Sequence, residues 1–310
     1  MRAIFFGTPE LAVPALLALA DVAEIVGVVC QPDKPAGRSQ ALSPPAVKVA
    51  ALARGLEVHQ PAKVRTGELA RWVADRRPDV ALVLAYGRIL VKEVLEAPRV
   101  GCMNLHASLL PRWRGAAPIT WAVVNGDTET GVTLMQMDEG LDTGPTLSTR
   151  AIPIGPDETA GELGARIAAL AAIVVREDLA RAVGGGFPPV AQDDARATLA
   201  RILVKEDGRV DWSKPAKAIH DHVRGMQPWP GAHTTARGRG LKLLATAPRD
   251  APTSAPPGTI VQADKHGVVV ACGNGAIAIV RAQVEGKKPL VAAELAAGRA
   301  LTAGDVLGPT

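Results

Sequence analysis

The order of apolar and polar positions divides the first half of the chain into short buried strands separated by helices. Continuous apolar runs at 2–6, 25–30 and 80–84 are typical of strands buried on both faces of a sheet. The apolar stretch 11–19 predicts a helix. Pro14 is compatible with it only near the first turn, where a proline is tolerated. Strands that alternate with helices indicate a doubly wound α/β fold with a mostly parallel sheet.

A second apolar pattern indicates a long helix further along the chain. Apolar side chains recur at helical spacing within 159–183, at Leu163, Ile167, Leu170 and Val174. Three glycines that begin at Gly184 end this helix, and the proline pair that follows prevents it from resuming.

The last third of the chain has a different pattern. Residues 189–207 are polar and irregular, which predicts a linker. After it come short apolar runs separated by glycine-containing turns, at 258–262, 267–271 and 276–280. Several short strands of this kind are typical of a small β-barrel. We therefore expect a Rossmann-like domain over 1–188, a linker over 189–207 and a β-barrel domain over 208–310.

Length and composition agree with two globular domains. The chain has 310 residues, of which 47% are hydrophobic and 21% charged, so it is too long for one ordinary core and too apolar for disorder. The first apolar run breaks at Gly7, too early for a secretion signal, and no run is long enough to span a membrane. We therefore expect a cytoplasmic protein without a membrane partner. The sequence is silent on oligomeric state, for which a monomer is our expectation.

Motifs of two other protein classes are missing from the sequence. The turn that begins at Gly7 lacks the GxGxxG pattern, which argues against a nicotinamide-dependent enzyme. Cys30, Cys102 and Cys272 lie far apart without CxxC spacing, which argues against a disulfide framework and against a zinc site. We expect no metal.

Charge is distributed unevenly along the chain. Residues 1–205 contain 22 basic and 22 acidic residues, whereas residues 206–310 contain 13 and 9, so the net charge of +4 lies in the last third. A basic domain attached to a neutral one suggests a polyanionic partner such as nucleic acid. The excess is modest, and an ordinary soluble surface explains it equally well.

The candidate chemistry lies in two polar segments that follow apolar strands. Asn104 and His106 are two positions apart on one predicted strand, so their side chains share a face. An amide and an imidazole on the same face are hard to explain as core packing. The second segment is the acidic stretch 138–142, which ends at Asp142. Taken alone, its carboxylates are equally well explained as solvated turn residues.

These segments, NLHASLLPRWRGAAPI and MDEGLDTG, resemble the folate-dependent formyltransferases, whose hallmark is an Asn, a His and an Asp with an SLLP stretch. The motifs FFGTPELAVPAL, QPDKPAGR, VLAYGRIL, KEDGRVDW and PWPGA resemble the same family, so the similarity covers nearly the whole chain. It is closest to the members that formylate methionine carried on initiator tRNA. The resemblance implies a Rossmann-like catalytic domain followed by an OB-like β-barrel that binds tRNA.

The resemblance also implies the chemistry. The donor would be 10-formyltetrahydrofolate, and the acceptor the α-amino group of initiator methionyl-tRNA, for translation initiation. Asn104 and His106 would stabilise a tetrahedral oxyanion, while Asp142 would assist deprotonation of the amine and keep His106 charged. The residues expected to line the folate pocket are Ala85, Tyr86, Gly87, Arg88, Ser108, Leu109, Leu110 and Pro111.

Other residues would select tRNA as the acceptor. By resemblance, Arg38 in the loop 31–45 reaches the acceptor stem and Lys205 lies near the acceptor end. Ser39 and Gln40 follow Arg38, where relatives often have basic residues. Further cations could together follow a phosphate backbone, although each alone is better explained as a solvated charge. They are Arg209, Lys214, Lys217, Arg224, Arg237, Arg239 and Lys242.

Two alternatives remain open. The same three catalytic residues would serve a formyltransferase that acts on an amino sugar or a purine-precursor nucleotide, whose C-terminal domain would have no affinity for tRNA. The second alternative is a protein that binds folate or RNA without catalysis. The substitution His106→Ala discriminates it, because lost turnover with unchanged binding would support the catalytic mechanism and retained turnover would refute it.

Overall fold

The structure, a computed structural model, describes residues 1–36, 41–249 and 254–308. The chain forms two compact units. Unit 1 contains Met1–Pro118, Glu129–Pro153 and Gly164–Arg201, and unit 2 contains Ile119–Thr128, Ile154–Leu163 and Ile202–Thr310. The segment that the sequence suggests as a linker is therefore shared between the two units.

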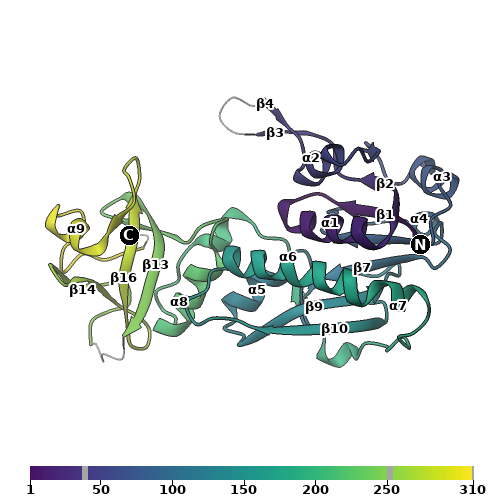
Figure 1. Cartoon of the computed structure of the whole chain (residues 1–310). Helices are drawn as coiled ribbons and strands as arrows, with labels where there is room; N and C mark the ends of the chain where they lie inside the picture. The colour runs from purple at the N-terminus through teal and green to yellow at the C-terminus, as the bar shows by residue number, and fades with distance from the viewer. Residues whose placement is uncertain (37–40, 250–253, 309–310) are drawn as a thin grey trace. The chain divides into compact units, whose positions relative to one another are not determined.

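Unit 1 is built on a seven-stranded, mostly parallel sheet (Figure 1). β1 pairs in parallel with β2 and β6, and β6 with β7, whereas β9 runs antiparallel to β7 and β10 antiparallel to β9. In spatial order the strands are β10 (Thr146–Pro153), β9 (Glu129–Gln136), β7 (Cys102–His106), β6 (Val80–Leu84), β1 (Arg2–Gly7), β2 (Glu24–Val29) and β5 (Val58–His59). The predicted α/β class is confirmed.

The apolar runs of the sequence correspond to the central strands of this sheet. All five side chains of β6 are buried, as are those of β1 after Arg2, because helices cover both faces. The first predicted helix starts later than expected. A 3₁₀ turn, η1 (Glu10–Ala12), precedes α1 (Val13–Val22), which places Pro14 in the first turn, where its missing N–H costs nothing.

Short helices pack on the sheet between the strands. On one face, Ile4 and Phe6 of β1 form a cluster with Leu69, Val73 and Val94. The helices of unit 1 after α1 are α2 (Ala46–Ala53), α3 (Glu68–Asp75), α4 (Lys92–Leu95), most of α6 (Ala160–Glu177), α7 (Leu179–Val183) and the 3₁₀ turn η2 (Asp194–Arg196). In the described ranges, no helix combines the length and apolar character needed to cross a membrane.

The helix expected over 159–183 is divided into two. α6 buries Leu163 and Ile167 as the spacing predicts, but the helix breaks at Asp178 before α7 begins. The Asp178 carboxylate accepts hydrogen bonds from Arg150 at 2.6 Å and from Ser148 at 3.0 Å. These residues lie on β10, and apolar spacing gives no sign of such a contact.

The predicted loop 31–45 contains a small antiparallel pair. β3 (Lys34–Ala36) pairs with β4 (Ala41–Ser43), and the base of the pair is fixed by Asp33. Asp33 accepts hydrogen bonds from Gln60 and Lys48, and these bonds lower the pKa of its carboxyl group. Arg38 lies outside the described residues.

Unit 2 is an antiparallel sheet closed into a barrel-like domain. β12 (His233–Ala236), β13 (Arg239–Arg249), β16 (Ala276–Val284), β15 (Gly267–Ala271) and β14 (Ile260–Asp264) follow in spatial order, and β17 (Leu290–Val291) pairs with β16. Leu307 bridges to Ala236 at one edge of the sheet, while Val306 bridges to Thr259 at the other. One terminal segment therefore joins both edges, which agrees with the predicted barrel.

The longest strand of unit 2 is not among the strands expected from the sequence. In β13, the buried Leu241 and Leu243 flank the exposed Lys242, and this period of two is the signal that reveals a strand. Helical segments of unit 2 are α5 (Pro118–Val124), the 3₁₀ turn η3 (Lys205–Gly208), α8 (Ala216–Gly225) and α9 (Ala292–Ala297).

Candidate active site

The carboxyl ends of the parallel strands place the candidate chemistry at one edge of the sheet in unit 1. Asn104 and His106 lie in the last three positions of β7, where Asn104 is paired with Val83 on one side and Met135 on the other. Both side chains are nearly buried, with 9% and 5% exposed. Ligands of open α/β sheets bind at this edge, so the location suits a reactive site.

Asp142 joins these two side chains into one cluster. Its Oδ1 accepts a long hydrogen bond of 3.4 Å from the Asn104 amide, and its Oδ2 lies 3.5 Å from Nδ1 of His106. The same Oδ2 accepts a 2.8 Å hydrogen bond from the backbone N–H of Gly115. Asp142 therefore contacts both of the other residues that the family resemblance singles out.

Both ring nitrogens of His106 face oxygen acceptors. Nε2 lies 2.8 Å from the carbonyl oxygen of Trp113, and Nδ1 faces Asp142. A carbonyl oxygen only accepts, so Nε2 carries a hydrogen, and a second hydrogen on Nδ1 makes the contact with Asp142 attractive. The ring is therefore held in one orientation between two oxygen acceptors.

The backbone around Asp142 is unusual. Asp142 has a φ of 54°, in the left-handed region that few non-glycine residues adopt. Next to it, a side chain at Gly144 would lie 1.9 Å from the carbonyl oxygen of Gln136. The turn is thus close to neighbouring backbone, and the conformation persists because surrounding bonds hold it.

The segment expected to contact folate at the end of β6 contributes mainly backbone. Tyr86 is buried with its ring edge-on to Phe6 at 5.4 Å, and burial raises the pKa of its phenol to about 12. Ala85 and Gly87 are exposed and have positive φ values of 50° and 79°. Arg88 donates to the carbonyl oxygens at 61 and 62. A ligand would therefore meet the turn at its exposed backbone, whereas the Tyr86 side chain is a core residue.

Sequence reasoning missed Gln31, which fixes this turn. Its amide donates to the carbonyl oxygens of Tyr86 at 2.9 Å and Gly87 at 3.2 Å, and Thr8 donates to Tyr86 as well. Gln31 follows β2, whose carboxyl end lies at the same edge of the sheet. A polar residue directly after an apolar strand is a candidate site residue, and this was the signal in the sequence that could have identified Gln31.

The second expected folate segment, Ser108 to Pro111, follows β7 directly. Ser108 is fully buried, and its hydroxyl donates to the carbonyl oxygen of Arg112 at 2.6 Å, so its side chain shapes the turn. Leu109, Leu110 and Pro111 are half-buried and remain able to contact a ligand. Ser108 is thus structural in this conformation, and its three successors are the better lining candidates.

The cations expected to bind tRNA differ in exposure. Lys205 is exposed at the start of η3, as are six of the seven further cations. The exception is Arg224, which is 5% exposed, paired with Asp221 and bonded to the carbonyl oxygens of Gly155 and Glu158. Arg224 therefore stabilises unit 2 internally and drops out of the surface set.

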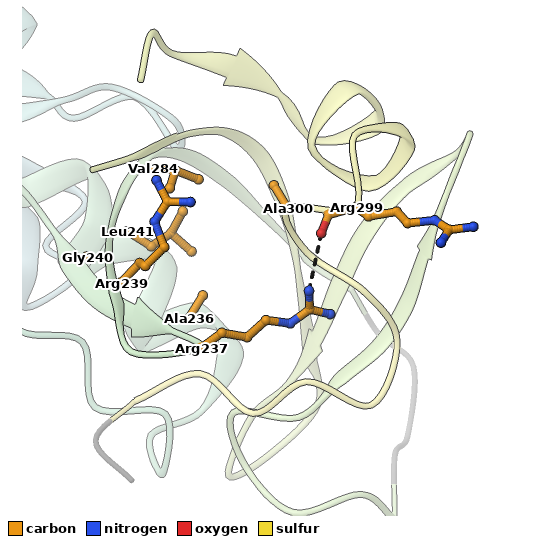
Figure 2. A pocket seen from close by; sticks show the side chains of 8 residues that line it. All are labelled: Ala236, Arg237, Arg239, Gly240, Leu241, Val284, Arg299 and Ala300. Carbon is orange, nitrogen blue, oxygen red and sulfur yellow. Dashed lines mark hydrogen bonds between the residues drawn. The ribbon is translucent and has the colours of Figure 1, made fainter. Parts of the chain in front are cut away.

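A small pocket in unit 2 is lined partly by arginines (Figure 2). Arg237 donates to the carbonyl oxygen of Arg299 and to Asp305. Arg239 lies beside Val284, whereas the Arg299 side chain points away from the others. Much of the charge here is already engaged within the protein.

The described residues include no group of three or more His, Cys, Asp or Glu side chains that could hold a metal ion. The three cysteines are buried and unpaired with one another. Burial raises the pKa of the Cys102 thiol to about 12 and that of Cys30 to about 11, so both remain protonated at neutral pH and are poor nucleophiles.

Solved structures share this architecture at low sequence identity. An N-formyltransferase from Helicobacter canadensis aligns with a TM-score of 0.69 and 16% identity over 90% of this chain and 98% of its own. A methionyl-tRNA formyltransferase from Clostridium thermocellum aligns with a TM-score of 0.54 and 16% identity, covering 81% of this chain and 95% of its own. At such identities these likenesses show the fold alone.

Sequence comparisons are more specific. Residues 1–178 match the family described as formyl transferase, and residues 202–300 match the formyl transferase C-terminal domain. A methionyl-tRNA formyltransferase from Sorangium cellulosum is 64% identical over 99% of this chain and its own entire length. One from Trichlorobacter lovleyi is 48% identical over 99% of this chain and 97% of its own. The chain belongs to the formyl transferase family.

Proposed function

We propose that the protein transfers the formyl group of 10-formyltetrahydrofolate to the α-amino group of methionine on initiator tRNA, for translation initiation. The observation that carries the chemistry is the Asp142 carboxylate, which contacts the Asn104 amide, the His106 ring and the Gly115 N–H at the carboxyl edge of the sheet. The full-length similarity to methionyl-tRNA formyltransferases supports tRNA as the acceptor.

In this proposal Asn104 and His106 act on the charge that develops during the reaction. The amine forms a bond to the formyl carbon, and the electron pair of the carbonyl bond moves to its oxygen. The Asn104 amide has a second N–H beyond the one facing Asp142, and this N–H donates to the oxyanion. His106 has both nitrogens engaged, so it contributes its positive charge from a fixed position.

Asp142 serves as the proton acceptor. It takes a proton from the attacking amine, directly or through water, and the electron pair of the oxyanion then reforms the carbonyl bond as the carbon–nitrogen bond to folate breaks. The departing folate nitrogen takes up the proton that Asp142 received, directly or through water, which restores the carboxylate and leaves the sum of protons unchanged. The site needs no metal for these steps, because the imidazolium and the amide supply the stabilisation.

Substrate contacts extend this proposal to the rest of the chain. The exposed backbone of Ala85 and Gly87 and the side chains of Leu109 to Pro111 would hold the folate, while Arg38 and Lys205 would contact the tRNA. We propose the boundaries 1–188 for the catalytic domain, 189–207 for the linker and 208–310 for the tRNA-binding domain. We also propose that the protein acts as a cytoplasmic monomer.

A direct assay tests the proposal. Purified protein is incubated with 10-formyltetrahydrofolate and methionine-charged initiator tRNA, and formylmethionine is quantified by mass spectrometry after release from the tRNA. We expect rapid formylation that depends on the charged amine, with uncharged tRNA as the control. A protein that formylates a nucleotide-linked amino sugar and leaves the charged tRNA unmodified would contradict the proposal.

A further inference from the structure

The segment 192–200 lies inside the region that sequence polarity suggests as a linker, yet it bonds to the walls of the candidate active site. Its Gln192 donates through one amide nitrogen to two backbone carbonyl oxygens, that of Asp142 at 2.8 Å and that of Gly144 at 2.7 Å. These residues bound the turn that carries the Asp142 carboxylate. The segment and the turn both belong to unit 1.

Arg114 fixes the orientation of the Gln192 amide. The guanidinium donates to Gln192 Oε1 at 3.0 Å and to Asp194 at 2.8 Å, and Arg114 is itself only 6% exposed. Because the amide oxygen faces the guanidinium, the amide nitrogen must face the two carbonyls. A glutamate has no hydrogen to donate to them, so the position needs an amide.

The same segment also bonds to the residues that hold His106 and Asp142. The Thr198 hydroxyl accepts from the backbone N–H of Trp113, whose carbonyl oxygen faces His106. β11 (Leu199–Ala200) pairs in parallel with β8 (Arg114–Gly115), and Gly115 donates its N–H to Asp142. The turn at 142–144 and residues 113–115, which contact the cluster, are thus both bonded to this segment.

We propose that Gln192 is a positioning residue for Asp142, acting through the turn at 142–144, with Arg114 orienting its amide. Asp142 adopts a left-handed backbone conformation, which a free turn would leave readily. Gln192 bonds the carbonyl of this very residue and so sets the direction of its carboxylate toward Asn104 and His106. The inference rests on the proposed catalytic role of Asp142.

Gln192→Glu is the sharpest test, because it preserves shape and the acceptor for Arg114 but removes the two donated hydrogen bonds. We expect kcat for tRNA formylation to fall about 10- to 100-fold, as for a small displacement of a reacting group. The KM values for folate and tRNA and the Tm should stay near those of the parent. Gln192→Ala also removes the two donated hydrogen bonds, and it adds no carboxylate.

Asp194→Asn is the matched control, because it removes the ion pair of Arg114 and leaves the three bonds of Gln192 in place. Its kcat should remain near that of the parent, since Asp194 is an exposed partner. A loss equal to that of Gln192→Glu would indicate general loosening of the segment and would overturn the proposal.

A double substitution separates positioning from simple stability. In an Asp142→Asn background, Gln192→Glu should cause no further loss of kcat, because both changes act through one carboxylate. Independent, multiplicative losses would contradict the proposal. Full activity of Asp142→Asn alone would instead refute the proposed role of Asp142.

Hydrogen exchange gives a readout that does not depend on activity. In Gln192→Ala we expect faster amide exchange in the turn 140–144 and unchanged exchange in the strands of the sheet. Protection equal to that of the parent protein would overturn the inference. This measurement also distinguishes failure of the positioning role from failure of the proposed function.

Discussion

The polar groups around Asp142 and the basic groups on unit 2 are built in opposite ways. At the first, side chains that are almost fully buried are bonded to one another, to backbone and to a segment about 50 residues away. At the second, cations such as Lys205, Arg209 and Lys242 are exposed. If the buried cluster is catalytic and the exposed cations bind RNA, as proposed, then catalysis should depend on a few irreplaceable contacts, whereas RNA binding should be spread over many replaceable ones.

His106→Ala should have the largest effect, because it removes a buried ring whose two nitrogens both face oxygen acceptors. We expect kcat/KM for formylation to fall about 10²- to 10⁴-fold, with tRNA affinity close to that of the parent. Steady-state kinetics and equilibrium tRNA binding measure the two quantities. The exposed His266 provides the control, and unchanged turnover in His106→Ala would mean that the buried cluster is not catalytic.

Arg224→Ala tests whether a buried cation of unit 2 behaves like the buried cluster or like the surface. Loss of its contacts leaves the buried Asp221 with Lys217 as its ion-pair partner, so the free energy of unfolding should fall by about 3 kcal/mol, the lower end of the range for breaking a buried pair. Urea unfolding measures this change. The exposed Arg209→Ala should change stability by no more than about 0.5 kcal/mol, and equal effects of the two variants would remove the distinction.

Gly115→Ala should distort the cluster without touching a side chain. Gly115 has a φ of 119°, and an added methyl group would lie 2.7 Å from the carbonyl oxygen of Ala200. We expect a loss of about 1–3 kcal/mol in unfolding free energy, together with reduced kcat. Gly185→Ala is a control with positive φ but open space around it, so it isolates backbone strain from the close contact.

Lys205→Ala should have the smallest effect, and it tests the contribution of one exposed cation of unit 2 to tRNA binding. Binding of tRNA should weaken as salt increases, and the variant should reduce the slope of log K against log salt by about 1, with kcat nearly unchanged. Filter binding over a series of salt concentrations measures the slope. Lys92→Ala in unit 1 is the control, and a parent protein with no salt dependence would refute the polyanion argument.

The sequence predicts much of the fold because burial leaves a local, periodic trace. The continuous apolar runs of β1, β2 and β6 identify the parallel sheet, and the motif around Asn104 and His106 points to the candidate site. The position of Gln31 after an apolar strand places it at the site edge of the sheet, but it does not reveal the hydrogen bonds to carbonyls more than 50 positions away. The alternation of buried and exposed side chains in β13 also indicates a strand, but β13 was not among the expected strands.

The charge of the sequence is also only partly informative, because it does not show which charged side chains are exposed. The count of basic residues correctly separates a neutral first part from a basic last third. It does not distinguish Arg224, which is buried in an ion pair, from Arg209 on the surface. Exposure of a charged side chain depends on which elements pack above it, and composition carries no information about that.

The sequence by itself determined the class of fold and the positions of the central buried strands, and it singled out the side chains that are proposed to carry the chemistry. Those properties are encoded by residue type and spacing within a few neighbouring positions. Only the tertiary structure decided that Asp142 contacts both Asn104 and His106, and that Gln192 in a linker-like stretch holds it there. Such contacts join segments that are remote in sequence, so their geometry exists only once the chain has folded.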